Sequence, residues 1–149
     1  MTKKSALSTE EAIELIETLK RKVIDQTYYI PNGKGRFEFE VVSDDDQSFV
    51  VNVQRKGINA DNCTYLGRLP EGIVLLRLDV GNTLVHYDKK TNTHIKGAHL
   101  HIYSAEYGTE TIPFDVSNKD LLTLCMDFFE RFHIVDPPKV AQVALLEGF

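Results

Sequence analysis

Apolar and polar residues alternate over two neighbouring segments in the first half of the chain, residues 36–42 and 48–56. Successive side chains of a β-strand point to opposite faces of a sheet, so this period of two predicts strands with one buried and one exposed face. An apolar sheet face has to be covered by another element. The chain is therefore expected to fold around a β-sheet with one covered face.

Further strand-like segments follow, and turn residues separate them. Together the predicted strands cover residues 36–42, 48–56, 63–68, 73–80, 98–103 and 109–114, the third of which is short. Residues 81–97 form a long connection with a small turn of their own at 88–92. Short connections favour antiparallel pairing, so we expect a largely antiparallel sheet of about five strands.

A helix is predicted before the strands. Ser8 and Glu11 have the spacing of a capping box, in which the serine caps the helix and the glutamate reaches back. The apolar residues that follow recur at helical spacing. This pattern predicts a helix over residues 9–25.

Helical signals return after the last strand. A second helix is predicted over residues 117–133, with Asp120 in its box-like start. The prolines at 137–138 end this helix and begin another, which is expected to end near Gly148. The order of helix, strands and helices predicts a single α+β domain over residues 1–149, its sheet packed against N- and C-terminal helices.

Composition restricts the classes of partner. The net charge is −5, and an acidic surface repels phosphate backbones, so broad nonspecific coating of nucleic acid is disfavoured while local binding of one strand stays open. No apolar run reaches the roughly 20 residues that span a bilayer, and no secretory signal is recognisable. We expect a cytoplasmic protein with no membrane partner, in which Cys63 and Cys125 are reduced and packed.

Groups able to move protons or bind anions are concentrated between Arg77 and Glu106. Four of the five histidines lie there, namely His86, His94, His99 and His101. On strand 73–80 the alternation puts Arg77 and Asp79 on the polar face, and on strand 98–103 it puts His99, His101 and Tyr103 there. If the two strands are neighbours, these five side chains converge, and His86 or His94 folds over them from the connection.

The first interpretation of this set is metal-independent acid/base catalysis on a phosphodiester. Histidine titrates near neutrality, so His99 and His101 are the candidate acid and base. Asp79 would orient them, and Arg77 would bind phosphate through two parallel hydrogen bonds. His86 and Tyr103 are the residues expected to contact the substrate. RNA is the expected substrate, and this reading needs no cofactor.

Two other interpretations of the same residues stay open. Two histidines one residue apart on a strand can reach one metal ion, and His99, His101 and Glu106, with His86, would leave a coordination position open. Alternatively, the polar residues are the ordinary exposed face of an antiparallel sheet, and Arg77 with Asp79 is a surface ion pair.

A family resemblance rests on the same residues. The run Arg77-x-Asp79, His86, Gly97-x-His99-x-His101-x-Tyr103 and Tyr107-Gly108 resembles a small uncharacterised family of bacteria and their mobile elements. It is also similar to the Arg/Asp, His and His-x-His core of the TumE-like toxins of toxin–antitoxin pairs. The resemblance covers roughly residues 77–114. It implies a cytoplasmic toxin-like protein that acts on RNA, carries over Arg77, Asp79, His86, His99 and His101, and is encoded beside a neutralising protein partner.

A non-catalytic role is the competing prediction for the whole chain. An antitoxin-like regulator or a phage-type inhibitor needs only an exposed strand edge or an apolar patch. Its acidic surface would mimic nucleic acid or bind a basic partner. Self-association into a homo-oligomer is compatible with either role.

Overall fold

The computed structural model describes residues 7–56, 62–81 and 84–142. The helices and strands of these residues are, in chain order, α1 (Thr9–Glu17), β1 (Lys20–Lys22), β2 (Tyr28–Ile30), β3 (Gly35–Ser43), β4 (Ser48–Arg55), β5 (Cys63–Arg68), β6 (Val74–Val80), β7 (Val85–Asp88), β8 (Thr93–Lys96), β9 (His99–Ser104), β10 (Gly108–Pro113), α2 (Leu121–Arg131), β11 (Ile134–Asp136) and β12 (Val140–Gln142).

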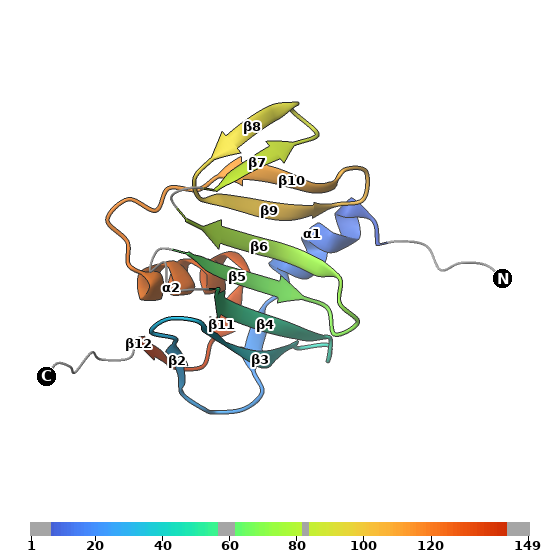
Figure 1. Cartoon of the computed structure of the whole chain (residues 1–149). Helices are drawn as coiled ribbons and strands as arrows, with labels where there is room; N and C mark the ends of the chain where they lie inside the picture. The colour runs from blue at the N-terminus through green and yellow to red at the C-terminus, as the bar shows by residue number, and fades with distance from the viewer. Residues whose placement is uncertain (1–6, 57–61, 82–83, 143–149) are drawn as a thin grey trace, which may run out of the picture.

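One large sheet dominates the structure (Figure 1). It has eight strands in the order β10-β9-β6-β5-β4-β3-β1-β11, and every pair is antiparallel except β1 with β11. Two small sheets accompany it: β12 pairs with β2, and β7 forms a hairpin with β8. The expected α+β architecture and antiparallel pairing are found, but the expected strand number of about five was too low. The predicted turn at residues 88–92 is the turn of the β7–β8 hairpin.

Both helices pack on the same face of the sheet (Figure 1). The apolar side chains of α2, among them Phe128, Phe129 and Phe132, meet the aromatic side chains of the central strands. The Tyr65 hydroxyl donates a hydrogen bond of 2.8 Å to the Leu121 carbonyl at the start of α2. Because the helices occupy this face, the polar side chains of β6 and β9 are left on the other.

Gly67 permits the closest approach between the sheet and the end of α2. A Cβ atom at this position would lie 2.5 Å from two ring carbons of Phe132, well inside van der Waals contact. The phenyl ring therefore occupies the space above β5 that a side chain would otherwise fill. This contact fixes how deeply α2 sits on the sheet.

The first helix is shorter than predicted. It ends at Glu17, and residues 20–22 form β1 between β3 and β11. Leu19 and Val23, the apolar residues that extended the helical pattern, do not line the core, since they are 50% and 49% exposed. The backbone of this segment instead hydrogen-bonds within the sheet, and tertiary pairing overrides the local helical period.

The C-terminal region also differs from the prediction. The second helix covers Leu121–Arg131, and Asp120, not Ser117, caps it by accepting a 2.8 Å hydrogen bond from the Thr123 amide. The helix predicted after the two prolines is wrong over 140–142, which form β12 beside β2. The rest of that predicted helix, residues 143–149, lies outside the described residues. The local sequence pattern could not predict the pairing of β12 with the distant strand β2.

Neither α1 nor α2, the helices found in the described ranges, is long and apolar enough to pass through a membrane.

A buried lysine joins the ends of both helices to the sheet. The Lys20 side chain is completely buried, and its ammonium donates to the carbonyls of Ile16, Thr18 and Phe132 at 2.7–2.8 Å. It also lies over the rings of Phe49 and Phe132. Burial lowers the pKa of Lys20 to about 7, whereas the carbonyl acceptors and ring faces favour the charged form. A cation here satisfies carbonyls at two helix C-termini.

Replacing this lysine is expected to destabilise the fold. Lys20→Met keeps the aliphatic part of the side chain but removes the ammonium from the carbonyls of Thr18 and Phe132, and it leaves the Ile16 carbonyl with His133 Nδ1 alone. This should cost about 2 kcal/mol or more of unfolding free energy. Lys22→Met on the same strand removes only the surface ion pair with Asp136 and should cost less than about 1 kcal/mol. Urea denaturation measures both. Equal losses in the two variants would contradict the role given to Lys20.

Candidate functional site

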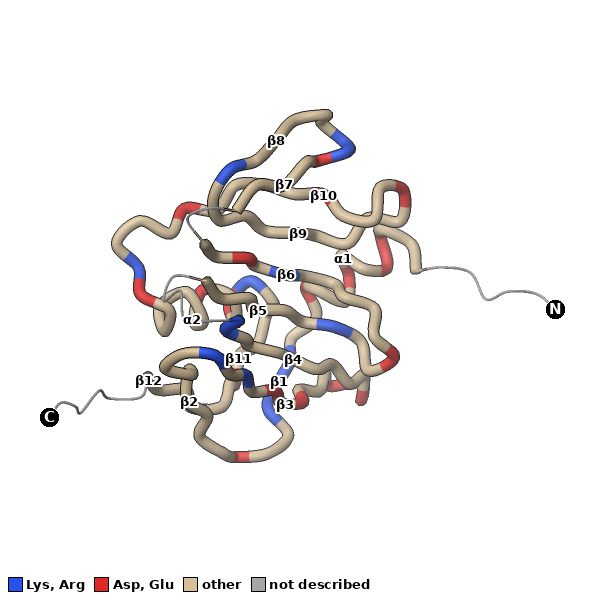
Figure 2. The backbone as a smooth tube through the Cα atoms, viewed as in Figure 1, with Lys and Arg blue, Asp and Glu red and all other residues tan. Residues whose placement is uncertain are grey.

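The pairing of β6 with β9 brings the predicted polar residues together. The two strands are antiparallel neighbours, with Arg77 opposite His101 and Asp79 opposite His99. Leu76, Leu78, Leu100 and Ile102 alternate with them and face the helices, as strand geometry requires. In Figure 2 the basic and acidic positions follow each other along β6. The neighbour relation on which the predicted convergence depended is therefore present.

The β7–β8 hairpin adds a third histidine from a separate layer. The His86 ring lies edge-on to His101 with centroids 4.6 Å apart and stacks on His99 at 5.4 Å. The rings of His99 and His101 are themselves 4.7 Å apart. We call His86, His99 and His101 the imidazole cluster. One nitrogen of each ring lies within 4.8 Å of the corresponding nitrogens of the other two.

Asp79 connects this cluster to the arginine. Its Oδ2 atom accepts a 3.0 Å hydrogen bond from Arg77 Nη2 and lies 3.1 Å from His101 Nε2 and 3.5 Å from His99 Nε2. Its Oδ1 atom accepts from the Thr64 hydroxyl at 3.2 Å. Burial raises the pKa of Asp79, but the hydrogen bond from His101 and the charge of Arg77 outweigh burial and hold the pKa at about 2.

The buried histidines are fixed by neighbours on their other nitrogen. His99 Nδ1 lies 2.8 Å from the Gly97 carbonyl oxygen, which only accepts, so Nδ1 carries the proton and donates. His101 Nδ1 lies 3.3 Å from the Thr111 hydroxyl. His99 and His101 are only 3% and 4% exposed, while His86 is half-buried. Burial and the two neighbouring histidines lower the pKa of His86.

Asp88 positions the hairpin. From the sequence this residue was predicted only to lie in the turn at residues 88–92. Its buried carboxylate accepts hydrogen bonds from the amide and hydroxyl of Thr91 and from the Thr111 amide on β10. Thr111 is the residue whose hydroxyl contacts His101. Asp88 thus joins the hairpin turn to the strand beside the cluster. An aspartate three residues before a threonine is a turn signal, but nothing in it predicts the bond to β10.

A cavity of about 280 Å³ borders the site. Arg77 and Asp79 line it together with residues of β4, β5 and the end of β6, including Gln54, Lys56, Asn62 and Thr64. Two polar atoms buried around it, Arg77 Nε and Asn62 Oδ1, have no hydrogen-bond partner among the described residues. Buried polar atoms are normally paired, so this cavity offers one spare donor and one spare acceptor.

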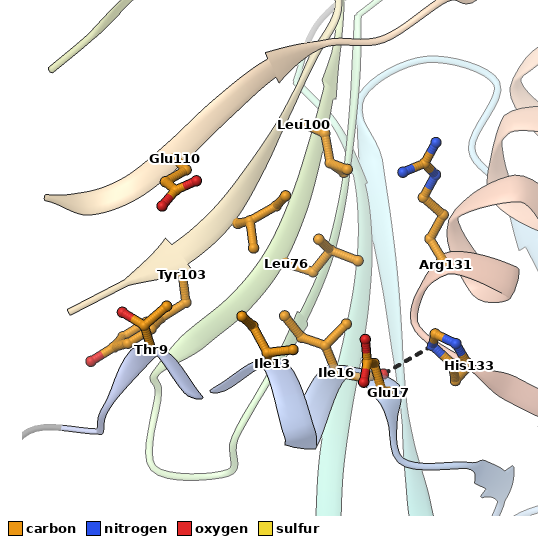
Figure 3. A pocket seen from close by; sticks show the side chains of 11 residues that line it. Thr9, Ile13, Ile16, Glu17, Leu76, Leu100, Tyr103, Glu110, Arg131 and His133 are labelled. Carbon is orange, nitrogen blue, oxygen red and sulfur yellow. Dashed lines mark hydrogen bonds between the residues drawn. The ribbon is translucent and has the colours of Figure 1, made fainter. Parts of the chain in front are cut away.

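Three other residues of the predicted region lie outside the cluster. The Tyr103 hydroxyl donates to the Leu7 carbonyl at 2.6 Å, and Figure 3 shows the ring beside Thr9 at the start of α1. Glu106 is exposed in the turn after β9. The ligand atoms that lie together come from His86, His99 and His101, and the predicted Glu106 ligand is not among them. His94 is exposed on β8, against Tyr87. The structure therefore groups five of the named residues: Arg77, Asp79, His86, His99 and His101.

A second cavity, of about 330 Å³, lies on the helix-covered face (Figure 3). Ile13 and Ile16 of α1, Leu76 and Leu100 of the sheet and Arg131 at the end of α2 are among its lining residues. Its lining also includes Glu17, Glu110 and His133, so both cavities have apolar and ionisable walls. Arg77 and Asp79 line the first cavity, whereas none of the three imidazoles of the cluster is among the lining residues of either one.

Comparison with known proteins places the chain in a family. Residues 7–134 match a family of unknown function (DUF6978). The chain belongs to this family. The match extends from just before α1 to the start of β11, so the whole site lies within the family region. No curated protein and no solved structure matches the chain. The similarity to TumE-like toxins stays a prediction.

The depressed pKa of Asp79 predicts an acid-sensitive contribution to stability. Folding lowers the pKa of Asp79 from 3.8 to about 2. The ionised carboxylate therefore adds about 2 kcal/mol to the free energy of unfolding above pH 4. This contribution is lost as the pH falls towards the folded-state pKa. Wild type should thus exceed Asp79→Asn in unfolding free energy at pH 6, and the difference should shrink between pH 4 and pH 2.

Chemical denaturation at a series of pH values measures this difference. Asp44→Asn is the matched control, because Asp44 is highly exposed and only 3.9 Å from Arg21, and its effect should stay near zero throughout. A difference for Asp79→Asn that is the same at pH 6 and pH 2 would contradict the assignment of a paired, ionised Asp79.

Proposed function

We propose that the site is a metal-independent acid/base centre that cleaves RNA phosphodiester bonds. The proposal is supported by the hydrogen bonds that join Arg77, Asp79 and His101, by the rings of His86 and His99 that pack against His101, and by the cavity that Arg77 and Asp79 line. A cation, an oriented carboxylate and several imidazoles are the groups that such a reaction needs without a metal.

Arg77 is proposed to hold the phosphate. Its Nη2 binds Asp79, its buried Nε has no partner among the described residues, and the residue is part of the cavity lining. Lys56 lies in the same lining and adds a second positive charge. A guanidinium with a free N–H next to a cavity is suited to a phosphate oxygen. These two positive charges would offset the negative net charge of the chain at the place where the substrate binds.

The imidazole cluster supplies the proton transfers. His86 is the most accessible of the three rings, and its lowered pKa keeps it neutral at pH 7, so it is the proposed base that removes the proton of the ribose 2′-hydroxyl. The 2′-oxygen then attacks phosphorus and the bond to the 5′-oxygen breaks. His101, 3.1 Å from Arg77, gives the leaving oxygen its proton, and Asp79 orients that ring.

The products are a 2′,3′-cyclic phosphate and a 5′-hydroxyl end. His99 stays in the acid/base set predicted from the sequence, because the Nε2 atoms of His99 and His101 both face the Asp79 carboxylate. Its bond to Gly97 gives it a fixed orientation within the cluster.

An RNA-cleavage assay tests the reaction. Pure chelator-treated protein should cut an unstructured RNA into fragments with 2′,3′-cyclic phosphate ends, and His101→Ala and Arg77→Ala should each lower the rate about 10²–10⁴-fold. His94→Ala is the matched control: this histidine lies on the same hairpin, is exposed and packs against Tyr87. It should keep the wild-type rate.

Absence of cleavage by folded wild-type protein over a range of salt and pH would contradict the proposal. Cleavage that survives in His101→Ala and in Arg77→Ala would also contradict it, because the activity would then come from elsewhere or from a contaminant.

A toxin-like setting follows from this activity. Unrestricted cutting of unstructured RNA would harm the cell that makes the enzyme, and we propose that a cognate protein partner neutralises it here. The two buried free cysteines, Cys63 and Cys125, suit a reducing compartment. Expression of the wild type alone should then inhibit growth, and His101→Ala should relieve the inhibition.

A second candidate function, that of a non-catalytic interaction protein, is favoured by the surface of α1. Glu10, Glu14 and Glu17 are exposed on this helix around Ile13, whose side chain is 43% exposed. Figure 2 shows the acidic positions gathered along α1. An acidic face with an apolar centre fits a basic protein partner.

Charge reversal separates the two candidates. If α1 is the functional surface, the triple variant Glu10→Lys, Glu14→Lys, Glu17→Lys should lose the biological effect of the protein in cells, whereas His101→Ala should keep it. The acid/base proposal predicts the opposite pattern. Circular dichroism of both variants confirms that each is folded before the effect is scored.

A further inference from the structure

We propose that His86, His99 and His101 form a binding site for one zinc ion, and that zinc switches off the phosphodiester chemistry. The zinc site stands on the geometry of these three side chains. Its inhibitory effect rests on the proposed function, since it requires that the same imidazoles carry protons in the reaction.

The three imidazoles already lie near coordinating distance. Their nearest set of nitrogens falls within 4.8 Å of one another. Zinc–nitrogen bonds of about 2.0–2.1 Å place tetrahedral ligand atoms about 3.3 Å apart. His86 comes from the β7–β8 hairpin, a separate two-stranded unit, while the other two come from β9 of the large sheet. A short inward movement of the hairpin would therefore complete the site.

The orientation of His99 suits a metal ligand. Its Nδ1–H is committed to the Gly97 carbonyl, so the neutral ring presents a lone pair on Nε2. That lone pair faces Asp79 Oδ2 at 3.5 Å, an arrangement that is attractive only when a proton or a cation lies between the two atoms. A backbone carbonyl on the second ring nitrogen is the usual support of a zinc-binding histidine.

Asp79 lies beside two of the three ligands and outside the set itself. Its Oδ2 is 3.1 Å from His101 Nε2 and 3.5 Å from His99 Nε2, but among the described residues the ligand atoms within 4.8 Å of one another come from the three histidines. Three imidazoles are a common zinc ligand set, and they would leave the fourth position of the tetrahedron open. The negative charge of Asp79 next to two of these ligands favours a bound cation.

Arg77 is expected to lower the affinity of the site for zinc. Its Nη2 lies 3.0 Å from Asp79 Oδ2 and 3.1 Å from His101 Nε2, where it competes with zinc for the imidazole nitrogen and its own charge disfavours a second cation. The side chain is 39% exposed and borders the cavity, so it can withdraw. Zinc would then occupy the acid/base nitrogens and displace the phosphate-binding guanidinium at the same time.

A metal titration with two readouts tests the proposal. Untagged, chelator-treated full-length protein is titrated with zinc in a calorimeter, and with Co²⁺ while visible absorption reports tetrahedral coordination. One equivalent should bind. His86→Ala should weaken binding by about tenfold or more, Arg77→Met should tighten it, and the control His94→Ala should change neither. RNA cleavage, measured along the same titration, should fall as the site fills.

The outcomes separate the two proposals. Absence of saturable one-to-one binding, or equal affinity in wild type and His86→Ala, overturns the zinc site. If zinc binds and cleavage is unchanged or rises, the inhibitory role is overturned. If one zinc binds with the expected variant pattern and neither form cuts RNA, the zinc site stands and the proposed function fails. Tighter binding by Arg77→Met supports the competition, because loss of a merely structural residue would not improve affinity.

Discussion

The antiparallel pairing of β6 with β9 is the constraint on which the candidate site depends. In this register Arg77 lies opposite His101 and Asp79 opposite His99, while the leucines between them face the helices. A slip of one residue in either strand would turn its polar side chains into the core. Burial of the apolar face under α1 and α2 therefore also places the guanidinium, the carboxylate and the imidazoles on one surface. The stability of the fold and the convergence of the site have the same cause.

Much of this arrangement was predictable because strand periodicity is local. The alternation along residues 73–80 and 98–103 correctly assigned the polar and apolar faces of both strands, and the neighbour relation that the prediction assumed is present. The pattern failed where distant parts of the chain decide. Residues 20–22 have a helical period but pair with two strands, and β12 pairs with β2. Tyr103, on the polar side by alternation, instead meets the start of α1 through its hydroxyl.

The hairpin that completes the site was the least predictable element. The sequence indicated a turn at residues 88–92, and His86 was expected to lie near the site. Its exact place depends on the buried carboxylate of Asp88, which binds a strand more than twenty positions later. The hairpin carries one of the three imidazoles, so its position sets the distance of His86 from the two histidines of β9. Arg77 has the opposing effect, since its charge favours an anion and disfavours a cation in the same space.

Under the proposed function, Arg77 and the three imidazoles act as one anion-binding, proton-transferring unit. Nitrogen-15 NMR of the histidine rings in metal-free protein, titrated with an RNA dinucleotide made uncleavable by a 2′-deoxy group, is the sharpest test. The signals of His86, His99 and His101 should shift together with the Arg77 Nε–H signal and saturate at one ligand, while those of His94 and His133 stay unchanged. Cluster signals that do not move, or shifts confined to His94 or His133, would contradict it.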